Sequence, residues 1–423
     1  MNSKKTLLPF FGLGLFFGLV SAPSLRAQSE LIRQLDLAPD KQVVQIARKL
    51  SAMGLESPEA QKKLAAKLKS ANVNVRGACV DAIPYLGKAS DETIHAIFDS
   101  LELGGTILPD AIPYVEAAAE ALEKIGPAAL PVAIEKLDAK SNLVYFGATD
   151  VIHRLGSEAE SAVGPLLERL KPGKREWATT YALAGIGKKS SPARDRLIEM
   201  LDSENFNSVC IACRALAEMG EAGAPAKKRL VRLVGEGNVS ERGRALQALG
   251  GIGAANDPEV RPLFEKGVVA FHQTIKERAI LGIGYMGKEK GKTLIPLVEK
   301  TLADPRYHNK PYAAVTLYRI GGSPEKVLKT LLTAMKDPTF ELDVIQKLGE
   351  LGADGKAALP KLEKYLDSED DYLRALVIET FGRIGASPEI REKLEEIVVT
   401  GDFQSSRTAR RVLAKEKKKE SRK

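Results

Sequence analysis

The sequence has few of the residues from which catalytic and metal sites are most often built. Its 423 residues include three cysteines, four histidines and one tryptophan, and aromatic residues make up only 5% of the chain. An odd cysteine count argues against a disulfide framework. Few aromatic residues, together with much alanine, leucine, glutamate and lysine, favour helices over a core built from sheets.

One cysteine pair has a spacing that suggests chemistry. Cys210 and Cys213 stand three residues apart, on one edge of an expected helix, where a redox or metal role is conceivable. Metal sites need further ligands, and no second cysteine pair or nearby histidine follows. The next residue is Arg214, which excludes the haem-attachment motif. Because both thiols flank the small residue Ala212, we favour a packing role, with a Cys210–Cys213 disulfide as the alternative.

Other catalytic patterns are missing as well. The histidines lie far apart in the sequence, none next to a glutamate: they are His95, His153, His272 and His308. The segment Gly250-Gly251-Ile252-Gly253 ends an expected helix and follows no strand, so it is not a phosphate-binding loop. No serine nucleophile elbow is present. We therefore predict no catalytic, metal-binding or cofactor-binding residue and no cofactor.

Positive charge is concentrated at the two ends. The formal net charge is +8, with 63 basic and 55 acidic residues. Leaving out residues 1–27 (Lys4, Lys5 and Arg26) and the segment 407–423 (nine basic and two acidic residues) leaves 51 basic against 53 acidic residues. The body of the chain is nearly neutral and does not predict a nucleic-acid groove.

The first 27 residues have the order of a secretory signal peptide. Lys4 and Lys5 precede an apolar run from Thr6 to Val20, and a small residue, Ala27, stands before a polar stretch. We expect export to the periplasm or the extracellular space with cleavage after Ala27. An uncleaved anchor is the alternative, although the run is shorter than the roughly 20 residues that a spanning helix needs.

An apolar-x-x-apolar-Gly pattern recurs eleven times. Its glycines are Gly54, Gly87, Gly126, Gly156, Gly187, Gly220, Gly253, Gly287, Gly321, Gly352 and Gly385. The gaps between them are 33, 39, 30, 31, 33, 33, 34, 34, 31 and 33 residues. Such a steady period is the signature of a repeat protein.

Each anchor glycine marks the end of an expected helix. Glycine at such a stop favours positive φ, and the apolar residues one and four before it share one helix face. Eight residues before the glycine a small residue recurs: Cys79, Ala118, Ala148, Thr179, Ala212, Ala245, Ala279 and Ala313. A small side chain there allows a neighbouring helix to approach closely.

Each unit therefore holds two helices. Prolines such as Pro192 and Pro324 suit the start of a first helix, and polar breaks such as 202–205 and 367–370 separate it from the second. One pair cannot bury its own apolar face, so the pairs must stack. The sequence predicts an all-α solenoid of about eleven helix pairs over residues 28–414, with the second helices lining the concave face and a basic C-terminal tail at 415–423.

The pattern resembles the HEAT repeat family in its short bacterial form, the PBS-lyase-like HEAT repeats. The resemblance is carried by Val75-Arg76-Gly77-Ala78-Cys79 with Ile83-Pro84-Tyr85-Leu86-Gly87, and by Leu373-Arg374-Ala375 with Phe381-Gly382-Arg383-Ile384-Gly385. The resemblance covers roughly residues 31–415 and implies a HEAT-repeat fold, but it says little about function. It also implies an alternative, a lyase-type or accessory enzyme subunit acting on a bound cofactor. The His-Glu pairs of the iron-binding deoxyhypusine hydroxylases are absent.

A non-enzymatic scaffold that binds a protein or peptide along the concave face is the predicted function. The partner-binding candidates lie six or two residues before the anchor glycines: Asp81, Glu120, Asp150, Tyr181, Arg214, Gln247, Tyr285, Arg319 and Arg383. Tyrosine and arginine often anchor interfaces. We expect the partner's basic part near Asp81–Asp150. Two weaker expectations are a contact of the basic tail with anionic envelope material and a contact loop at the insertion 104–109.

Overall fold

The computed structural model describes residues 22–104, 111–304 and 307–420, and within these ranges every regular element is a helix. The first half contains α1 (Ala22–Gln34), α2 (Asp40–Met53), α3 (Pro58–Lys67), α4 (Val73–Ala82), α5 (Asp91–Ser100), α6 (Ala111–Ile125), α7 (Leu130–Lys136), α8 (Asn142–Leu155), α9 (Val163–Arg169), α10 (Glu176–Ile186), α11 (Arg194–Met200), α12 (Phe206–Glu218) and α13 (Lys227–Glu236). The second half contains α14 (Val239–Gly251), α15 (Arg261–Gly267), α16 (Gln273–Tyr285), α17 (Gly287–Gly291), α18 (Ile295–Ala303), α19 (Lys310–Arg319), α20 (Pro324–Ala334), α21 (Glu341–Glu350), α22 (Leu359–Leu362), α23 (Asp371–Ile384), α24 (Pro388–Thr400) and α25 (Phe403–Glu420).

Short 3₁₀ helices join many of these elements. They are η1 (Ile83–Tyr85), η2 (Leu101–Gly104), η3 (Gly126–Ala129), η4 (Gly156–Ala162), η5 (Gly187–Ala193), η6 (Gly220–Ala226), η7 (Lys292–Leu294), η8 (Pro338–Phe340), η9 (Gly352–Ala358) and η10 (Glu363–Asp367). Five of them begin at an anchor glycine, so part of what the sequence predicts as loop is a tight helical turn. This geometry is common where one helix ends and the next begins.

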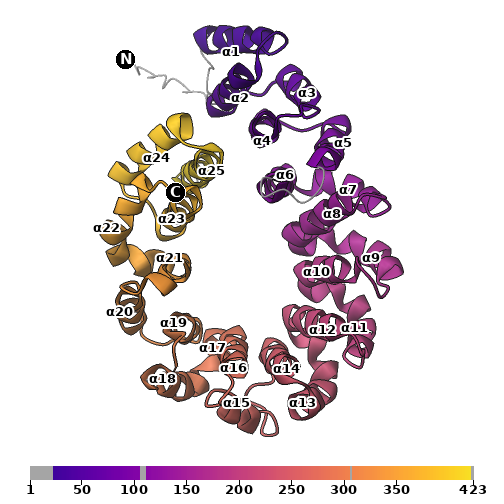
Figure 1. The fold of residues 1–423 in the computed structure, drawn as a ribbon, viewed down its shortest axis with the longest axis vertical. Helices are drawn as coiled ribbons and strands as arrows, with labels where there is room; N and C mark the ends of the chain where they lie inside the picture. The colour runs from indigo at the N-terminus through magenta and orange to yellow at the C-terminus, as the bar shows by residue number, and fades with distance from the viewer. Residues whose placement is uncertain (1–21, 105–110, 305–306, 421–423) are drawn as a thin grey trace, which may run out of the picture.

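The helices form stacked antiparallel pairs, which confirms the all-α solenoid. The outer helices run from α1 and α3 round to α22 and α24, and the inner helices run from α2 and α4 round to α23 and α25 (Figure 1). The inner helices are the predicted second helices. The described residues hold twelve pairs, one more than the eleven anchor glycines mark, because α24 and α25 form a last pair that does not end in such a glycine.

The anchor glycines have the predicted conformation. All eleven adopt positive φ, between 52° at Gly352 and 105° at Gly385. Such angles are open to glycine at little cost and strained for other residues. The anchors therefore end each inner helix, α2 to α23, and turn the chain toward the outer side of the stack.

The small residues predicted for close packing are fully buried. All eight positions, from Cys79 to Ala313, have 0% exposed surface. The apolar side chains around them belong to one continuous cluster that runs from Ile32 to Val412. Each pair buries its apolar face against its neighbours, as expected for a repeat protein.

Polar residues between the helices act as N-caps. The side chain of Asn205 accepts a hydrogen bond from the backbone N–H of Asn207 at the start of α12. Asp370 accepts from Tyr372 and Leu373 at the start of α23, and Ser323 caps α20 with Pro324 at its first position. These contacts satisfy donors that a helix N-terminus leaves free, and so fix where each helix begins.

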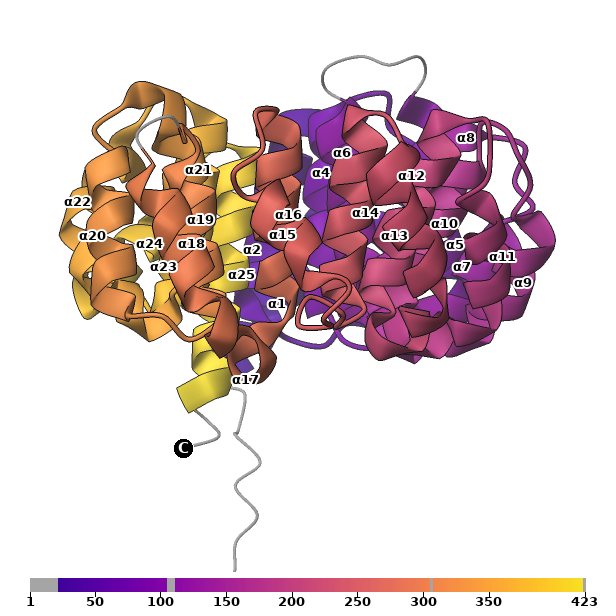
Figure 2. The same ribbon diagram turned by 90° about the horizontal axis from the view of Figure 1, so that it is seen from below.

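The stack curves until its two ends meet. Figures 1 and 2 both show α25, from the last pair, beside α2 and α4 of the first pairs. Contacts between α25 and α4, described below, close the solenoid into a ring. The sequence predicts a curved superhelix but not this closure.

Some predictions concern residues outside the described ranges. Most of the predicted signal peptide, residues 1–21, and residues 105–109 of the insertion at 104–109 lie there. The part of the predicted signal peptide that is described, up to Ala27, belongs to α1. No helix within the described ranges is long and apolar enough to cross a membrane.

Candidate functional site on the inner surface

Arginines of α25 join the two ends of the ring. Arg410 forms an ion pair with Asp81 of α4, and both side chains are less than 10% exposed. Arg407 and Arg411 both reach Glu120 of α6, at 3.1 and 3.3 Å. We call these five residues the junction. Charge-assisted hydrogen bonds from arginine to carboxylate are among the stronger polar contacts in proteins, so the junction holds α25 against α4 and α6.

Two further contacts support the junction. Arg411 also lies 3.3 Å from Glu379 of α23, so its guanidinium bridges both ends of the stack. Burial alone would raise the pKa of Glu379, but the charges of Arg411 and Arg383 outweigh it and hold this pKa below the ordinary value. On the other side, Arg48 of α2 donates to the backbone carbonyl of Gly401 at 3.3 Å.

The junction corrects the expectation for Asp81 and Glu120. The sequence predicts that these carboxylates hold the basic part of a separate partner, but in the structure they hold the basic helix α25 of the same chain. The third member of that acidic stretch, Asp150, accepts a hydrogen bond from Arg154 at 3.0 Å. These acidic residues do attract a basic segment, as the sequence predicts, but the segment belongs to the same chain.

The predicted tail at 415–423 begins inside α25, which continues to Glu420. Glu416 is buried: its carboxylate accepts from the backbone N–H of Ala386 and lies 2.9 Å from Arg391 of α24. The predicted boundary at 415 therefore does not coincide with the end of the packed helix.

A ladder of stacked rings lies on the middle inner helices. The rings of His153 and Tyr181 stack at 3.8 Å between centroids, and those of Tyr181 and Trp177 at 5.1 Å. The guanidinium of Arg214 lies 5.1 Å from the centre of the Tyr181 ring, in cation–π geometry. Burial lowers the pKa of His153, which favours its neutral form. The last ring of the ladder, Trp177, is 53% exposed.

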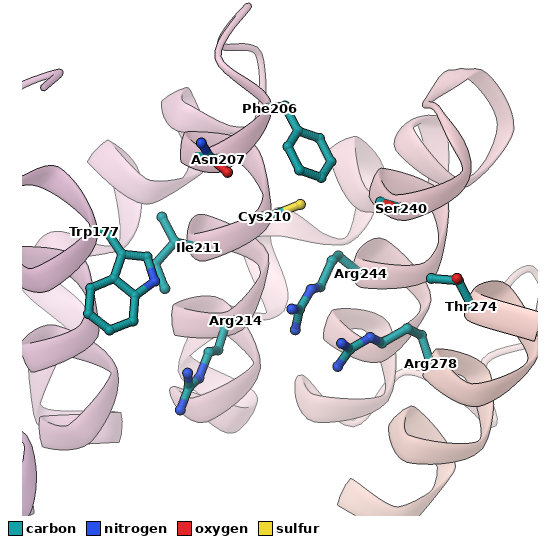
Figure 3. Close-up of a pocket in the computed structure, with 10 residues that line it drawn as sticks. All are labelled: Trp177, Phe206, Asn207, Cys210, Ile211, Arg214, Ser240, Arg244, Thr274 and Arg278. Atoms are coloured by element: carbon teal, nitrogen blue, oxygen red, sulfur yellow. The ribbon is translucent and has the colours of Figure 1, made fainter. Parts of the chain in front are cut away.

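A cavity of about 250 Å³ adjoins this ladder (Figure 3). We call it the arginine groove. Its walls come from α10, α12, α14 and α16 and consist of Trp177, Phe206, Asn207, Cys210, Ile211, Arg214, Ser240, Arg244, Thr274 and Arg278. Figure 3 shows the side chains of Arg244 and Arg278 pointing the same way, with Arg214 between them and the Trp177 ring.

The groove carries positive charge without matching negative charge. Its ten lining residues include three arginines and no aspartate or glutamate. Arg244 and Arg278 both donate to one acceptor, the side-chain oxygen of Gln247, at 3.4 and 3.1 Å. Burial, followed by the charge of Arg244, lowers the pKa of Arg278. Three cations gathered in a partly enclosed space attract an anion.

The structure divides the predicted partner-binding residues among several places. Tyr181, Arg214 and Gln247 lie at or beside the arginine groove, whereas Asp81 and Glu120 lie in the junction. Asp150 accepts from Arg154 on its own helix. The last three residues are held by neighbouring carboxylates: Tyr285 donates to Glu218 at 2.9 Å, Arg319 to Glu350 at 3.0 Å, and Arg383 to Glu379 at 2.6 Å.

Arg244, Arg278 and Trp177 were not among the residues predicted from the sequence. Arg244 and Arg278 stand nine residues before Gly253 and Gly287, where the units with glycines from Gly87 to Gly220 have a small or apolar residue. An arginine at this position in two successive repeats is a signal that could have identified both residues. The predicted candidates were taken only from the positions six and two residues before each anchor glycine. Trp177 lies one turn before Tyr181, on the same helix face.

The cysteines and histidines do not form a redox or metal centre among the residues that the structure describes. All three cysteines are free thiols; Cys213 is fully buried, as expected for packing, while the half-buried Cys210 lines the groove. Burial raises the pKa of Cys79 to about 12 and raises that of Cys210, so neither thiol is activated. His95 lies 3.6 Å from Glu135, but no group of three or more potential metal ligands occurs in the described part of the chain.

In comparisons with known proteins, no protein-family model and no curated protein matches the chain. Among solved structures, it is similar to an engineered protein at 18% identity and a TM-score of 0.34, over 85% of this chain and 99% of that one. It is also similar to Kap121p in complex with Nup53p, at 12% identity and a TM-score of 0.37, over 90% of this chain and 48% of Kap121p. TM-scores this low do not establish a shared fold, so the fold is assigned from the arrangement of the helices themselves.

Proposed function

We propose that this protein is a non-enzymatic scaffold that binds a protein or peptide on the inner surface of its ring. The observation that carries the proposal is the arginine groove, where exposed aromatic rings and unmatched arginines lie together. Buried interface centres are enriched in tryptophan, tyrosine and arginine. A groove of this composition on a rigid stack of helices is suited to binding rather than to chemistry.

The proposal also contains the narrower predictions from the sequence. These are membership of the HEAT repeat family and export by the segment 1–27. Cleavage after Ala27 would remove the first six residues of α1, Ala22 to Ala27, and would leave Gln28, whose buried side chain donates to the carbonyl of Leu55 at 2.9 Å.

A photo-cross-linking experiment tests the proposal. A cross-linking amino acid is placed at Tyr181 or Tyr285 on the inner helices α10 and α16, and, as a matched control, at the exposed Lys228 on the outer helix α13. We expect discrete protein adducts in an envelope extract from the inner positions and none from the control. Adducts from the outer position alone, or a co-purifying ligand that absorbs in the visible range, would contradict the proposal, the latter in favour of an accessory subunit acting on a cofactor.

A further inference from the structure

We infer that the arginine groove binds an acidic segment of a protein partner, with Asp or Glu carboxylates on Arg214, Arg244 and Arg278 and an adjacent apolar side chain on Trp177 and Phe206. The inference rests on the proposed scaffold function and reverses the charge expected of the partner. The sequence predicts a basic segment bound to acidic residues, whereas the charged residues that line the arginine groove are all cationic.

The three arginines have no carboxylate partner among the ion pairs of the described residues. Elsewhere in the molecule most arginines near the inner surface have one. Arg319 pairs with Glu350, Arg383 with Glu379 and Arg410 with Asp81. Within a nearly neutral body, the groove is therefore a local site of positive charge and not part of a basic face.

The acidic residues nearest the groove have other partners. The carboxylate of Glu241 accepts from the backbone N–H of Asn238, as part of the cap of α14. Glu277 accepts from the side chain of Asn309 at 3.0 Å, and Glu218 accepts from Tyr285 at 2.9 Å. None of these three residues lines the groove, and although the negative charge of Glu277 acts on Arg278, no carboxylate occupies the cavity itself.

The arginine side chains are held in position before any ligand binds. Gln247 fixes one N–H of Arg244 and one of Arg278, and Tyr181 supports the face of the Arg214 guanidinium. A guanidinium has five N–H donors in a planar fork, so each arginine keeps donors for a bidentate contact with a carboxylate. Holding these side chains in advance reduces the entropy lost on binding.

The size and composition of the groove favour peptide side chains over larger anions. A cavity of about 250 Å³ is smaller than the 300–1,000 Å³ that sites for drug-sized ligands usually occupy. Trp177 and Phe206 are 53% and 42% exposed at its edge, so apolar surface lies next to the charge. A carboxylate followed by an apolar side chain matches both features.

The test uses the intrinsic fluorescence of Trp177, the only tryptophan in the chain. The probe is a capped peptide of alternating Asp and Glu with a Phe at each end, and the control peptide replaces each acid by its amide. We expect a saturable change in Trp177 emission with the acidic peptide only. In an R244Q/R278Q variant, the affinity for the peptide should fall by about 10- to 100-fold, the range for losing charged hydrogen bonds.

Arg242→Gln is the matched control variant, because Arg242 is exposed on the same helix and does not line the groove. This variant should bind like the unchanged protein, and all variants should retain their helical circular dichroism. Equal binding by R244Q/R278Q, or binding of inorganic phosphate or anionic lipid vesicles through the same arginines without peptide binding, would overturn the inference. Inner-surface cross-links without peptide binding would overturn it too, yet leave the scaffold function standing.

Discussion

The junction and the arginine groove are both clusters of three arginines on the inner helices, and they differ in what faces them. In the junction, Arg407, Arg410 and Arg411 meet carboxylates of α4 and α6, and the contact joins the two ends of the ring. In the groove, Arg214, Arg244 and Arg278 line one cavity that no aspartate or glutamate lines. Arginine therefore stabilises the fold where a carboxylate lies opposite it. Where no carboxylate does, arginine remains available to bind an external anion.

The largest expected effect is that of breaking the junction. Asp81→Asn leaves Arg410 buried without its counter-ion, and removing one member of a buried ion pair costs about 3–5 kcal/mol. Because closure rests on polar contacts between α25 and the first pairs, we expect the ends to separate while the stacked pairs stay folded. Small-angle X-ray scattering should show a larger radius of gyration, and urea unfolding should show lower stability.

The double variant D81R/R410D restores the pair with its charges exchanged and is the control for this experiment. It should recover a compact scattering profile at least in part. A single variant that stays as compact and as stable as the unchanged protein would show that the junction does not hold the ring closed.

A smaller effect is expected from a glycine that sets the shape of the groove. A Cβ at Gly250 of α14 would overlap the backbone of Gly282 in α16, so these two glycines let the helices approach closely. We expect Gly250→Ala to cost about 1–3 kcal/mol through overpacking and to move Arg244 away from Arg278. Thermal unfolding and acidic-peptide binding should both weaken; weakening of neither would mean that this approach does not shape the groove.

Acid should weaken the contact between α23 and α25 that supports the junction. The pKa of Glu379 is lowered in the folded state, so its stabilising contribution is present above the ordinary value of 4.5 and is lost as the pH falls through the lower folded value. We therefore expect the stability measured by urea unfolding at constant ionic strength to fall progressively below pH 4.5. A loss of stability that instead begins as the pH rises above neutrality would have the wrong sign for this account.

The smallest expected effect comes from the groove itself. The charge of Arg244 acts on Arg278 more strongly than that of Glu277, so Arg278→Gln removes a net repulsion and should leave stability unchanged or raise it by about 0.5–1 kcal/mol. Arg410→Gln in the junction should lower it. Urea unfolding of the two variants side by side measures the contrast, and a substantial loss in Arg278→Gln would assign that arginine a structural role.

The fold was largely predictable from the sequence because each repeat contains the residues that determine its own local structure. An anchor such as Gly220 ends a helix by its φ, and a small residue such as Ala212 is buried by its spacing from that glycine. The junction was not predictable in this way. Arg410 and Asp81 lie 329 residues apart, and their contact depends on the summed curvature of all the pairs between them. The groove was half predictable, since Arg214 was identified and Arg244 and Arg278 were not.

The central claim is that the chain closes on itself through α25 and leaves the arginine groove for a partner. Spin labels at Lys49 and Val399, exposed positions next to the contact between Arg48 and Gly401, test the closure directly in a Cys210→Ser background. Pulsed electron paramagnetic resonance should give a single short-distance population that is lost in Asp81→Asn. A broad distribution of long distances in the unchanged protein would contradict the account.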